Sequence, residues 1–177
     1  YDKHTRCGLV ARGEIEHHIP NPRGLPYRSH QVRVRLPNGR RIELVNVHLQ
    51  AAATDLNLWS RDCWRSHHHN RKRRRMEIAV ALQKLEKTNI SPKLPAVIIA
   101  GDFNAPAGDR VYAMLKGEFT DTFSEVGSGW GSTYHRAFPI LRLDHIFASR
   151  AFHAARSRVV TVEESDHRMV ISDLIMK

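Results

Sequence analysis

The chain has little cysteine and no long apolar run, and both shortages narrow the class of protein. Two cysteines, Cys7 and Cys63, in 177 residues are too few for a disulfide scaffold. We expect two reduced thiols, with a single bridge as the alternative. The apolar runs are short, as in A-V-I-I-A at 96–100, whereas a transmembrane helix needs about 20 such residues. No repeat, low-complexity linker or signal peptide stands out. These features predict one soluble domain over 1–177 with its own core.

Acidic residues are also scarce relative to basic ones. There are 18 Asp and Glu against 28 Lys and Arg, a net charge of +10. This excess favours a polyanionic partner such as nucleic acid, a phosphate ester or an acidic lipid surface. The largest cluster is N-R-K-R-R-R at 70–75, which follows three histidines. It predicts contact with a phosphate backbone through Arg71, Arg73 and Arg74. The alternative interpretation is a solvated helix face.

Strand patterns alternate with helical ones along the chain. Residues 31–36 and 41–49 flank a P-N-G turn, which predicts a hairpin. An apolar stripe predicts a helix over 70–87, and the run at 96–100 predicts a buried strand. Further elements are predicted as strands at 8–19, 142–148, 156–162 and 169–175, a helix at 109–116 and a loop at 20–28. This order predicts the α/β (α+β) class, with sheets packed against outer helices.

Four short segments place catalysis-capable side chains where apolar strands end. They are V-N-V-H-L at 45–49, I-A-G-D-F-N at 99–104, R-L-D-H-I-F at 142–147 and S-D-H-R at 165–168. Any one of these aspartates would be interpreted as a turn residue. Together, however, carboxylates can hold a hard divalent cation and activate water, and a histidine beside a carboxylate can stabilise a phosphoryl group. The segments therefore supply the parts of a metal-assisted phosphoester hydrolase.

The order of these segments resembles that of the endonuclease/exonuclease/phosphatase (DNase I-like) superfamily. The resemblance spans about 8–177 and includes bacterial members in particular. G-D-F-N at 101–104 is its most specific motif. G-W-G-S-T-Y at 129–134 resembles the substrate-side loop of many bacterial members. The resemblance implies a DNase I-like two-sheet β-sandwich flanked by helices, of which this chain forms the C-terminal two-thirds.

The resemblance also implies roles for the matched residues. Asp102 would orient and activate the attacking water. Asn104 would bind the phosphate. His48 would contact the scissile phosphate and stabilise charge or protonate the leaving group. These three residues lie at the ends of two predicted strands.

The other matched residues lie in the last two segments. Asp144 would hold His167 in the correct tautomer, and His167 would bind a phosphoryl oxygen. Asp166 would lie at or beside Mg²⁺, with Mn²⁺ as the alternative cation. Asn46 shares a face with His48 and is counted only as a supporting residue. His145 lies on the opposite strand face from Asp144 and is left out of the site.

One family feature has no counterpart in this sequence. The family begins with a strand carrying an Asn and a second strand ending in Gln-Glu, whose Glu is the principal metal ligand. The early acids Asp2, Glu14 and Glu16 do not follow an apolar strand in that pattern. We therefore expect an N-terminally truncated fold that begins, at Tyr1, about a third of the way through the family.

These observations predict Mg²⁺-dependent hydrolysis of phosphodiester or phosphomonoester bonds by in-line attack of water, with nucleic acid as the favoured substrate. One alternative is a catalytically inactive domain that binds nucleic acid or a partner. Another is a phospholipid or inositol-phosphate hydrolase. A lipid enzyme needs an exposed apolar loop, for which Trp59, Trp64 and Trp130 are candidates. Tryptophans in such small numbers are more often core residues.

Overall fold

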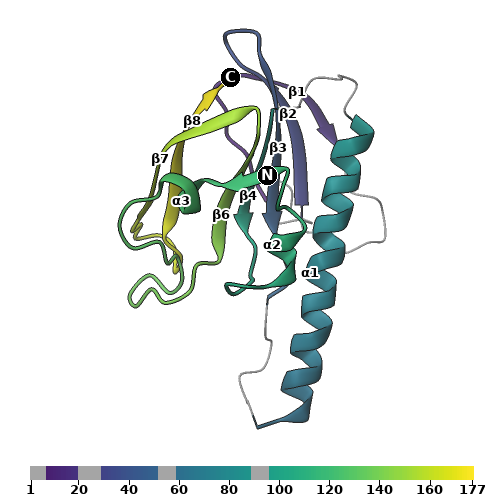
Figure 1. Cartoon of the computed structure of the whole chain (residues 1–177), viewed down its shortest axis with the longest axis vertical. Helices are drawn as coiled ribbons and strands as arrows, with labels where there is room; N and C mark the ends of the chain where they lie inside the picture. The colour runs from purple at the N-terminus through teal and green to yellow at the C-terminus, as the bar shows by residue number, and fades with distance from the viewer. Residues whose placement is uncertain (1–6, 20–28, 52–58, 89–95) are drawn as a thin grey trace.

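The computed structural model describes residues 7–19, 29–51, 59–88 and 96–177, which form a mixed α+β fold with two sheets (Figure 1). The larger sheet has six strands in the order β1-β2-β3-β4-β6-β5, and the smaller one pairs β7 with β8. The strands are β1 (Glu14–Ile19), β2 (Ser29–Arg35), β3 (Arg41–His48), β4 (Val97–Asp102), β5 (Phe119–Asp121), β6 (Asp144–Ser149), β7 (Phe152–Val160) and β8 (Met169–Met176). The helices are α1 (Arg61–Thr88), α2 (Arg110–Ala113) and α3 (Thr122–Val126). The predicted fold class is confirmed. The loop predicted at 20–28 lies outside the described residues.

The predicted hairpin is formed by β2 and β3, which pair antiparallel. Its turn closes through the amide of Leu36, which donates to the carbonyl of Arg40 at 2.8 Å. Gly39 lies in the turn with φ +79°, a conformation that glycine adopts without strain. Beyond the hairpin, β3 pairs parallel with β4, and β4 pairs antiparallel with β6. The carboxyl ends of β3 and β4 and the start of β6 therefore meet at one edge of the sheet.

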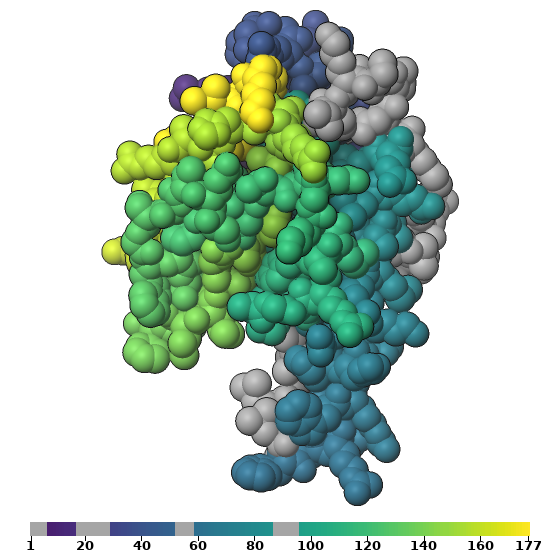
Figure 2. All heavy atoms as spheres, in the orientation of Figure 1, coloured from purple at the N-terminus to yellow at the C-terminus, as the bar shows by residue number. Residues whose placement is uncertain are grey.

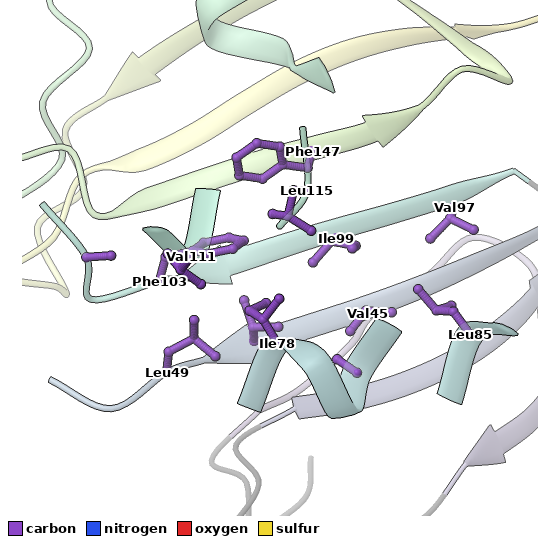
Figure 3. Packing of buried hydrophobic residues seen from close by; sticks show 13 residues of the cluster. Val45, Leu49, Ile78, Leu85, Val97, Ile99, Phe103, Val111, Leu115 and Phe147 are labelled. Carbon is purple, nitrogen blue, oxygen red and sulfur yellow. The ribbon is translucent and has the colours of Figure 1, made fainter. Parts of the chain in front are cut away.

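Helix α1 covers one face of the six-stranded sheet with its C-terminal half. Ile78, Ala81 and Leu85 are buried on this helix and belong to the main hydrophobic cluster (Figure 3). Across from them the sheet contributes buried residues such as Val45 and Ile99. The spacing of three to four residues between the helix positions places them on one face, as the sequence predicted.

The helix begins at Arg61 rather than at residue 70. The hydroxyl of Ser60 accepts a hydrogen bond from the amide of Asp62 at 3.2 Å, which caps the first turn. The N-terminal turns of α1 extend beyond the rest of the molecule (Figures 1 and 2). No helix in the described ranges combines the length and apolarity needed to cross a bilayer.

The small sheet lies beside β6 and α3. Three hydroxyls join these elements in a buried chain. Thr122 at the start of α3 lies 2.7 Å from the hydroxyl of Ser172 on β8, which lies 2.9 Å from that of Ser157 on β7. This packing positions the segment that connects β7 to β8 and carries S-D-H-R at 165–168.

Candidate active site

Three of the predicted residues form a row across the central strands. His48 at the end of β3 pairs in register with Asp102 at the end of β4, and Asp102 pairs in register with Asp144 at the start of β6. Neighbouring residues across a sheet place their side chains close together. The row arises because β3 and β4 are parallel and β6 runs the opposite way.

The backbone around Asp102 requires its neighbours in G-D-F-N. Gly101 has φ +133°, and a Cβ there would lie 2.0 Å from the carbonyl oxygen of Val47. Asn104 has φ +49°, and its main-chain amide donates to Asp102 Oδ1 at 2.8 Å. Its side-chain amide donates to Asp102 Oδ2 at 2.8 Å and to the carbonyl of Leu49 at 3.0 Å. Asn104 thus orients Asp102 and ties β4 to the end of β3.

His167 reaches the row from the loop before β8. Its Nδ1 lies 2.7 Å from Oδ2 of Asp144. The hydroxyl of Ser165 accepts the main-chain amide of His167 at 3.0 Å, which fixes the loop. The ring of Tyr134 lies against the imidazole with 4.9 Å between centroids. Asp144, the partner that the resemblance implied for His167, is therefore in contact with its ring.

Two carboxylates and one imidazole lie close together in this cluster and shift one another's pKa. Ligand atoms of Asp102, Asp144 and His167 all lie within 4.8 Å of each other, the one such metal-compatible group among the described residues. Burial, together with the negative charge of Asp144, raises the pKa of Asp102 to about 6. The hydrogen bond with Asp144 raises the pKa of His167 above its usual value. The site therefore holds a carboxylate that ionises less readily than usual beside a histidine that is protonated more readily than usual.

The remaining predicted residues lie around this cluster. His48 Nε2 is 3.8 Å from Asp102 Oδ2. Asn46 points its side-chain amide at the carbonyl of Gly8, to which it donates at 2.7 Å. Asp166 is exposed, and its charge contributes to raising the pKa of Asp102. The structure thus brings His48 and Asp166 to the cluster, while Asn46 supports the neighbouring main chain.

Arg74 does not fit the substrate contact predicted for it. Its side chain is fully buried, 0% exposed, and it forms an ion pair of 2.7 Å with Asp109. It also donates to the carbonyl of Gln50 at 3.2 Å. A guanidinium enclosed in this way does not reach a substrate. We therefore correct the prediction: Arg74 joins α1 to the segments before α2 and after β3.

The two other arginines predicted to contact the substrate, Arg71 and Arg73, are partly exposed. Arg71 lies 3.6 Å from the carboxylate of Asp109 and Arg73 lies 3.3 Å from that of Glu77. Glu77 also accepts the main-chain amide of Gln50 at 3.0 Å. Arg74 and Glu77, both buried on α1, therefore hold the main chain at Gln50, two residues beyond His48. The local sequence did not indicate this connection.

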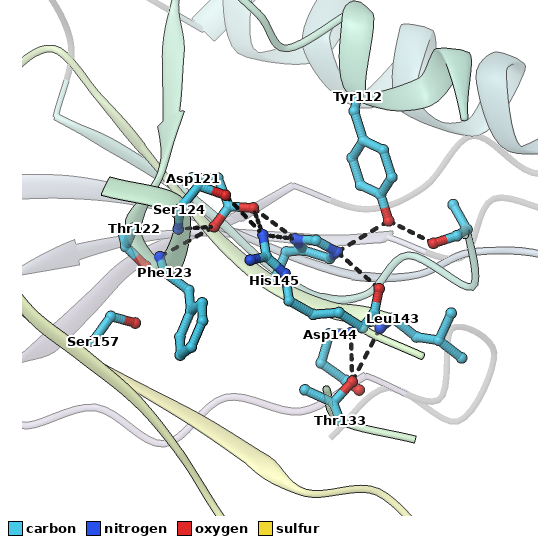
Figure 4. Close-up of polar contacts among 12 residues, drawn as sticks. Tyr112, Asp121, Thr122, Phe123, Ser124, Thr133, Leu143, Asp144, His145 and Ser157 are labelled. Carbon is cyan, nitrogen blue, oxygen red and sulfur yellow. Dashed lines mark hydrogen bonds and ion pairs between the residues drawn. The ribbon is translucent and has the colours of Figure 1, made fainter. Parts of the chain in front are cut away.

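Two further residues position the site without having been predicted individually. The hydroxyl of Thr133 accepts the main-chain amides of Leu143 and Asp144 at 3.0 and 3.1 Å (Figure 4). Thr133 is fully buried, and Tyr134 contacts His167. Both lie in the segment at 129–134, whose resemblance to a substrate-side loop was the available signal.

The donor set suits a hard divalent cation. Asp102 and Asp144 offer carboxylate oxygens within this group, and the charge of Asp166 acts on Asp102 from outside it. Mg²⁺ prefers oxygen ligands and keeps several waters. His167 suits this ion less well, and its Nδ1 is engaged by Asp144. The carboxylates therefore fit the cation, which leaves the histidine free to serve the substrate.

The fold and this cluster fit a family of phosphoesterase type, and the chain belongs to the Endonuclease/Exonuclease/phosphatase family, which it matches over residues 2–167. A Bacteroides vulgatus member of the family matches with a TM-score of 0.68 at 14% identity, covering 94% of this chain and 67% of that one. No curated protein gives a significant match.

Two of the similar structures are of named proteins. A Bacteroides thetaiotaomicron mannosyl-6-phosphatase matches with a TM-score of 0.65 at 21% identity over 84% of this chain and 57% of its own. A humanized D. rerio TDP2 matches with a TM-score of 0.61 at 20% identity over 84% and 60%. At these identities the likeness concerns the fold. This chain spans little more than half the length of several such structures.

Proposed function

We propose that the protein hydrolyses phosphodiester or phosphomonoester bonds with Mg²⁺ by in-line attack of water, with nucleic acid as the favoured substrate. The supporting observation is the convergence of Asp102, Asp144 and His167 within 4.8 Å at one edge of the central sheet. Membership of the family supports the same reaction class.

Asp102 is the proposed general base. A base works best when its pKa is close to the operating pH, and burial beside Asp144 raises the pKa of Asp102 to about 6. At neutral pH this carboxylate is therefore still ionised. It is also more basic than an ordinary aspartate, which favours proton transfer from water. Asn104 holds it by two hydrogen bonds. Contact between Asn104 and the phosphate would have to replace one of its present side-chain bonds.

His167 is the proposed phosphate contact. Asp144 engages Nδ1 and so leaves Nε2 for a phosphoryl oxygen. The raised pKa favours the imidazolium, whose charge would stabilise the negative charge that develops on the phosphoryl group. His48, at the end of the same row, would contact the phosphate from the β3 side. Mg²⁺ held at or beside Asp166, with Asp144 as a further carboxylate, would neutralise phosphate charge and favour ionisation of water.

Nucleic acid is favoured because of charge. The net charge of +10 attracts polyanions, and Arg71 and Arg73 remain partly exposed on α1. Each would contribute a phosphate contact without reading sequence.

The test is hydrolysis of DNA, RNA, sphingomyelin, an inositol phosphate and bis-p-nitrophenyl phosphate, with Mg²⁺ and with chelator. Because similar structures are longer, the assay uses this chain and the longest natural form that contains it. Magnesium-dependent turnover, lost in His167→Gln, is expected. The variants Asp144→Asn and His167→Gln should be non-additive, because one residue orients the other. Binding of nucleic acid without turnover by either form would favour the inactive binding domain.

A further inference from the structure

The N-terminal half of α1 projects past one edge of the central sheet. Arg74 donates to the carbonyl of Gln50, just beyond the end of β3, and Ile78 packs in the main hydrophobic cluster. The turns before Arg74 therefore extend beyond the edge at which β3 ends, as Figure 1 shows. At a rise of about 1.5 Å per residue, Arg61 lies roughly 20 Å farther out than Arg74. We call residues 61–73 the arm.

One face of the arm is exposed and basic. Four exposed side chains, spaced by four, three and four residues, follow one another along it: Arg61, Arg65, His68 and Lys72. Asp62 is the one acidic residue of the arm. It lies 3.2 Å from Arg65, and both side chains of this pair are more than three-quarters exposed. So exposed a pair is weak, and the face therefore keeps a positive potential that attracts polyanions.

The arm also exposes a tryptophan. Tryptophans in this chain were expected in the core, yet the exposed fractions of Trp59, Trp64 and Trp130 are 97%, 59% and 65%. That expectation does not hold for any of the three. Trp64 belongs to the arm, and the ring of His67 lies edge-on to its indole with 6.3 Å between centroids. This contact restrains the indole, which lowers the entropic cost of binding a ligand against it.

Trp64 and the basic face share one groove. The groove has a volume of about 530 Å³ and is lined by Trp64, Arg65, His68, His69 and Lys72. An aromatic ring beside cationic side chains is the combination with which proteins hold single-stranded nucleic acid, because the ring stacks with a base and the cations meet the phosphates.

The composition of the arm suits other polyanionic surfaces less well. A helix that lies on a bilayer needs a broad apolar face, and Trp64 is the one exposed large apolar side chain among residues 61–73. Duplex DNA offers phosphates, but its bases are stacked on one another and would leave the indole without a partner. An unpaired base can use the indole and the neighbouring cations together.

We propose that the arm binds single-stranded nucleic acid, with an unpaired base against Trp64 and the adjoining phosphates at Arg65 and Lys72. The proposal rests on the proposed function and narrows its substrate class to nucleic acid with an unpaired segment. The arm projects from the sheet edge that carries His48, so a strand held there extends from the side of the molecule where hydrolysis is proposed.

The test is fluorescence anisotropy of the full chain in chelator, with a labelled oligodeoxythymidine and a labelled duplex of equal length. Trp64→Ala should weaken binding of the single strand about tenfold through loss of stacking and leave the duplex unchanged. Trp64→Phe keeps an aromatic face and should retain most of the affinity. Arg65→Ala/Lys72→Ala should lower the salt slope for the single strand by about 1 to 2.

Matched controls separate position from composition. Ile175→Ala on β8 removes an apolar side chain that is 58% exposed and should change neither affinity. Arg156→Ala/Arg158→Ala on β7 removes two charges away from the arm and should lower the salt slope less than Arg65→Ala/Lys72→Ala does. Equal slopes for the two double variants, or equal losses of single-strand and duplex affinity in Trp64→Ala, would overturn the proposal.

Two further measurements distinguish this proposal from its alternatives. Sedimentation with phosphatidylserine vesicles that depends on Trp64, while oligonucleotide binding does not, would assign the arm to a lipid surface. Hydrolysis with Mg²⁺ is scored separately from binding. Trp64-dependent binding without turnover keeps the arm and rejects the proposed hydrolysis. Turnover with single-strand binding that is unaltered in Trp64→Ala rejects the arm alone.

Discussion

Strand β6 begins with two adjacent residues that each form a histidine–aspartate pair. Asp144 pairs with His167 at 2.7 Å in the candidate active site. His145 points the other way and pairs with Asp121 at 2.8 Å in a buried network (Figure 4). Its second ring nitrogen lies 3.0 Å from the hydroxyl of Tyr112. The two pairs have nearly the same geometry, so their surroundings must distinguish them.

The buried pair is surrounded by partners. Asp121 accepts the amides of Phe123 and Ser124 as the cap of α3 and forms an ion pair with Arg142. Burial alone would raise the pKa of Asp121, but its bond to His145 and these partners lower it overall. The open pair instead faces another carboxylate, whose pKa is raised. The buried histidine–aspartate pair has hydrogen-bond and ion-pair partners on its aspartate and stabilises the fold. The open pair lies beside a carboxylate with a raised pKa, which is typical of a site where chemistry takes place.

The largest effect, on the rate of hydrolysis, should follow removal of the Asp102 carboxylate. Asp102→Asn should reduce hydrolysis about 10³-fold, since the general base is lost. The melting temperature should stay close to that of the unmodified chain, because asparagine keeps one oxygen for the main-chain amide of Asn104, whose side-chain amide keeps its bond to the carbonyl of Leu49. Steady-state kinetics and thermal melting test this in parallel. A matching loss of stability would show that Asp102 supports the fold rather than the reaction.

The two pairs should differ in stability when one aspartate is truncated. Asp121→Ala leaves the part-buried guanidinium of Arg142 and the buried ring of His145 without their carboxylate and should cost about 3 kcal/mol of unfolding free energy. Asp144→Ala, at a partly exposed pair, should cost less than about 1 kcal/mol. Urea unfolding of both variants gives the comparison. The reverse order would mean that the open pair is the structural one.

The pH dependence of stability should have opposite signs in the two regions. The folded pKa of Asp102, about 6, lies above its ordinary 3.8. The contribution of Asp102 to the free energy of unfolding is therefore fully present below the ordinary pKa. It is lost as the pH rises through the pKa of the folded state. Asp121 has a lowered pKa, so its contribution is present above the ordinary value and is lost in acid.

Melting temperatures in chelator should show this for Asp102. Asp102→Asn should gain stability relative to the unmodified chain as pH rises from about 4 to 7. Asp121→Asn should instead lose its disadvantage as the pH falls below about 4. A difference for Asp102→Asn that stays constant with pH would contradict the raised pKa.

The smallest effect concerns the partly exposed arginines. Arg71→Ala/Arg73→Ala should weaken nucleic-acid binding a fewfold and lower the salt slope by about 1 to 2. Arg156→Ala/Arg158→Ala on β7, which removes the same two charges, is the matched control. Binding is measured by fluorescence anisotropy across salt concentrations. An equal effect of the control would assign binding to net charge rather than to α1.

Much of the fold follows from short-range patterns. Alternation around P-N-G predicted the β2–β3 hairpin, and the apolar stripe at Ile78 and Leu85 predicted the buried face of α1. Gly101 and Asp102 were expected at a strand end because the apolar run at 96–100 ends there, and Gly101 has a positive φ in the structure. Such features depend on residues within a few positions of each other, so local sequence patterns are enough to predict them. The family resemblance then supplied the pairing of Asp144 with His167.

Other features were decided by packing between distant segments. Arg74 looked like its exposed neighbours, but Asp109, 35 residues away, encloses it in an ion pair. Trp130 resembled a core residue, yet its loop turns the indole outward beside Arg168. Asp144 and His145 differ by one position, and only the layers on each side of β6 give one an open site and the other a buried network. Burial and charge neighbours depend on which segments meet in three dimensions, and this is why local pattern leaves them open.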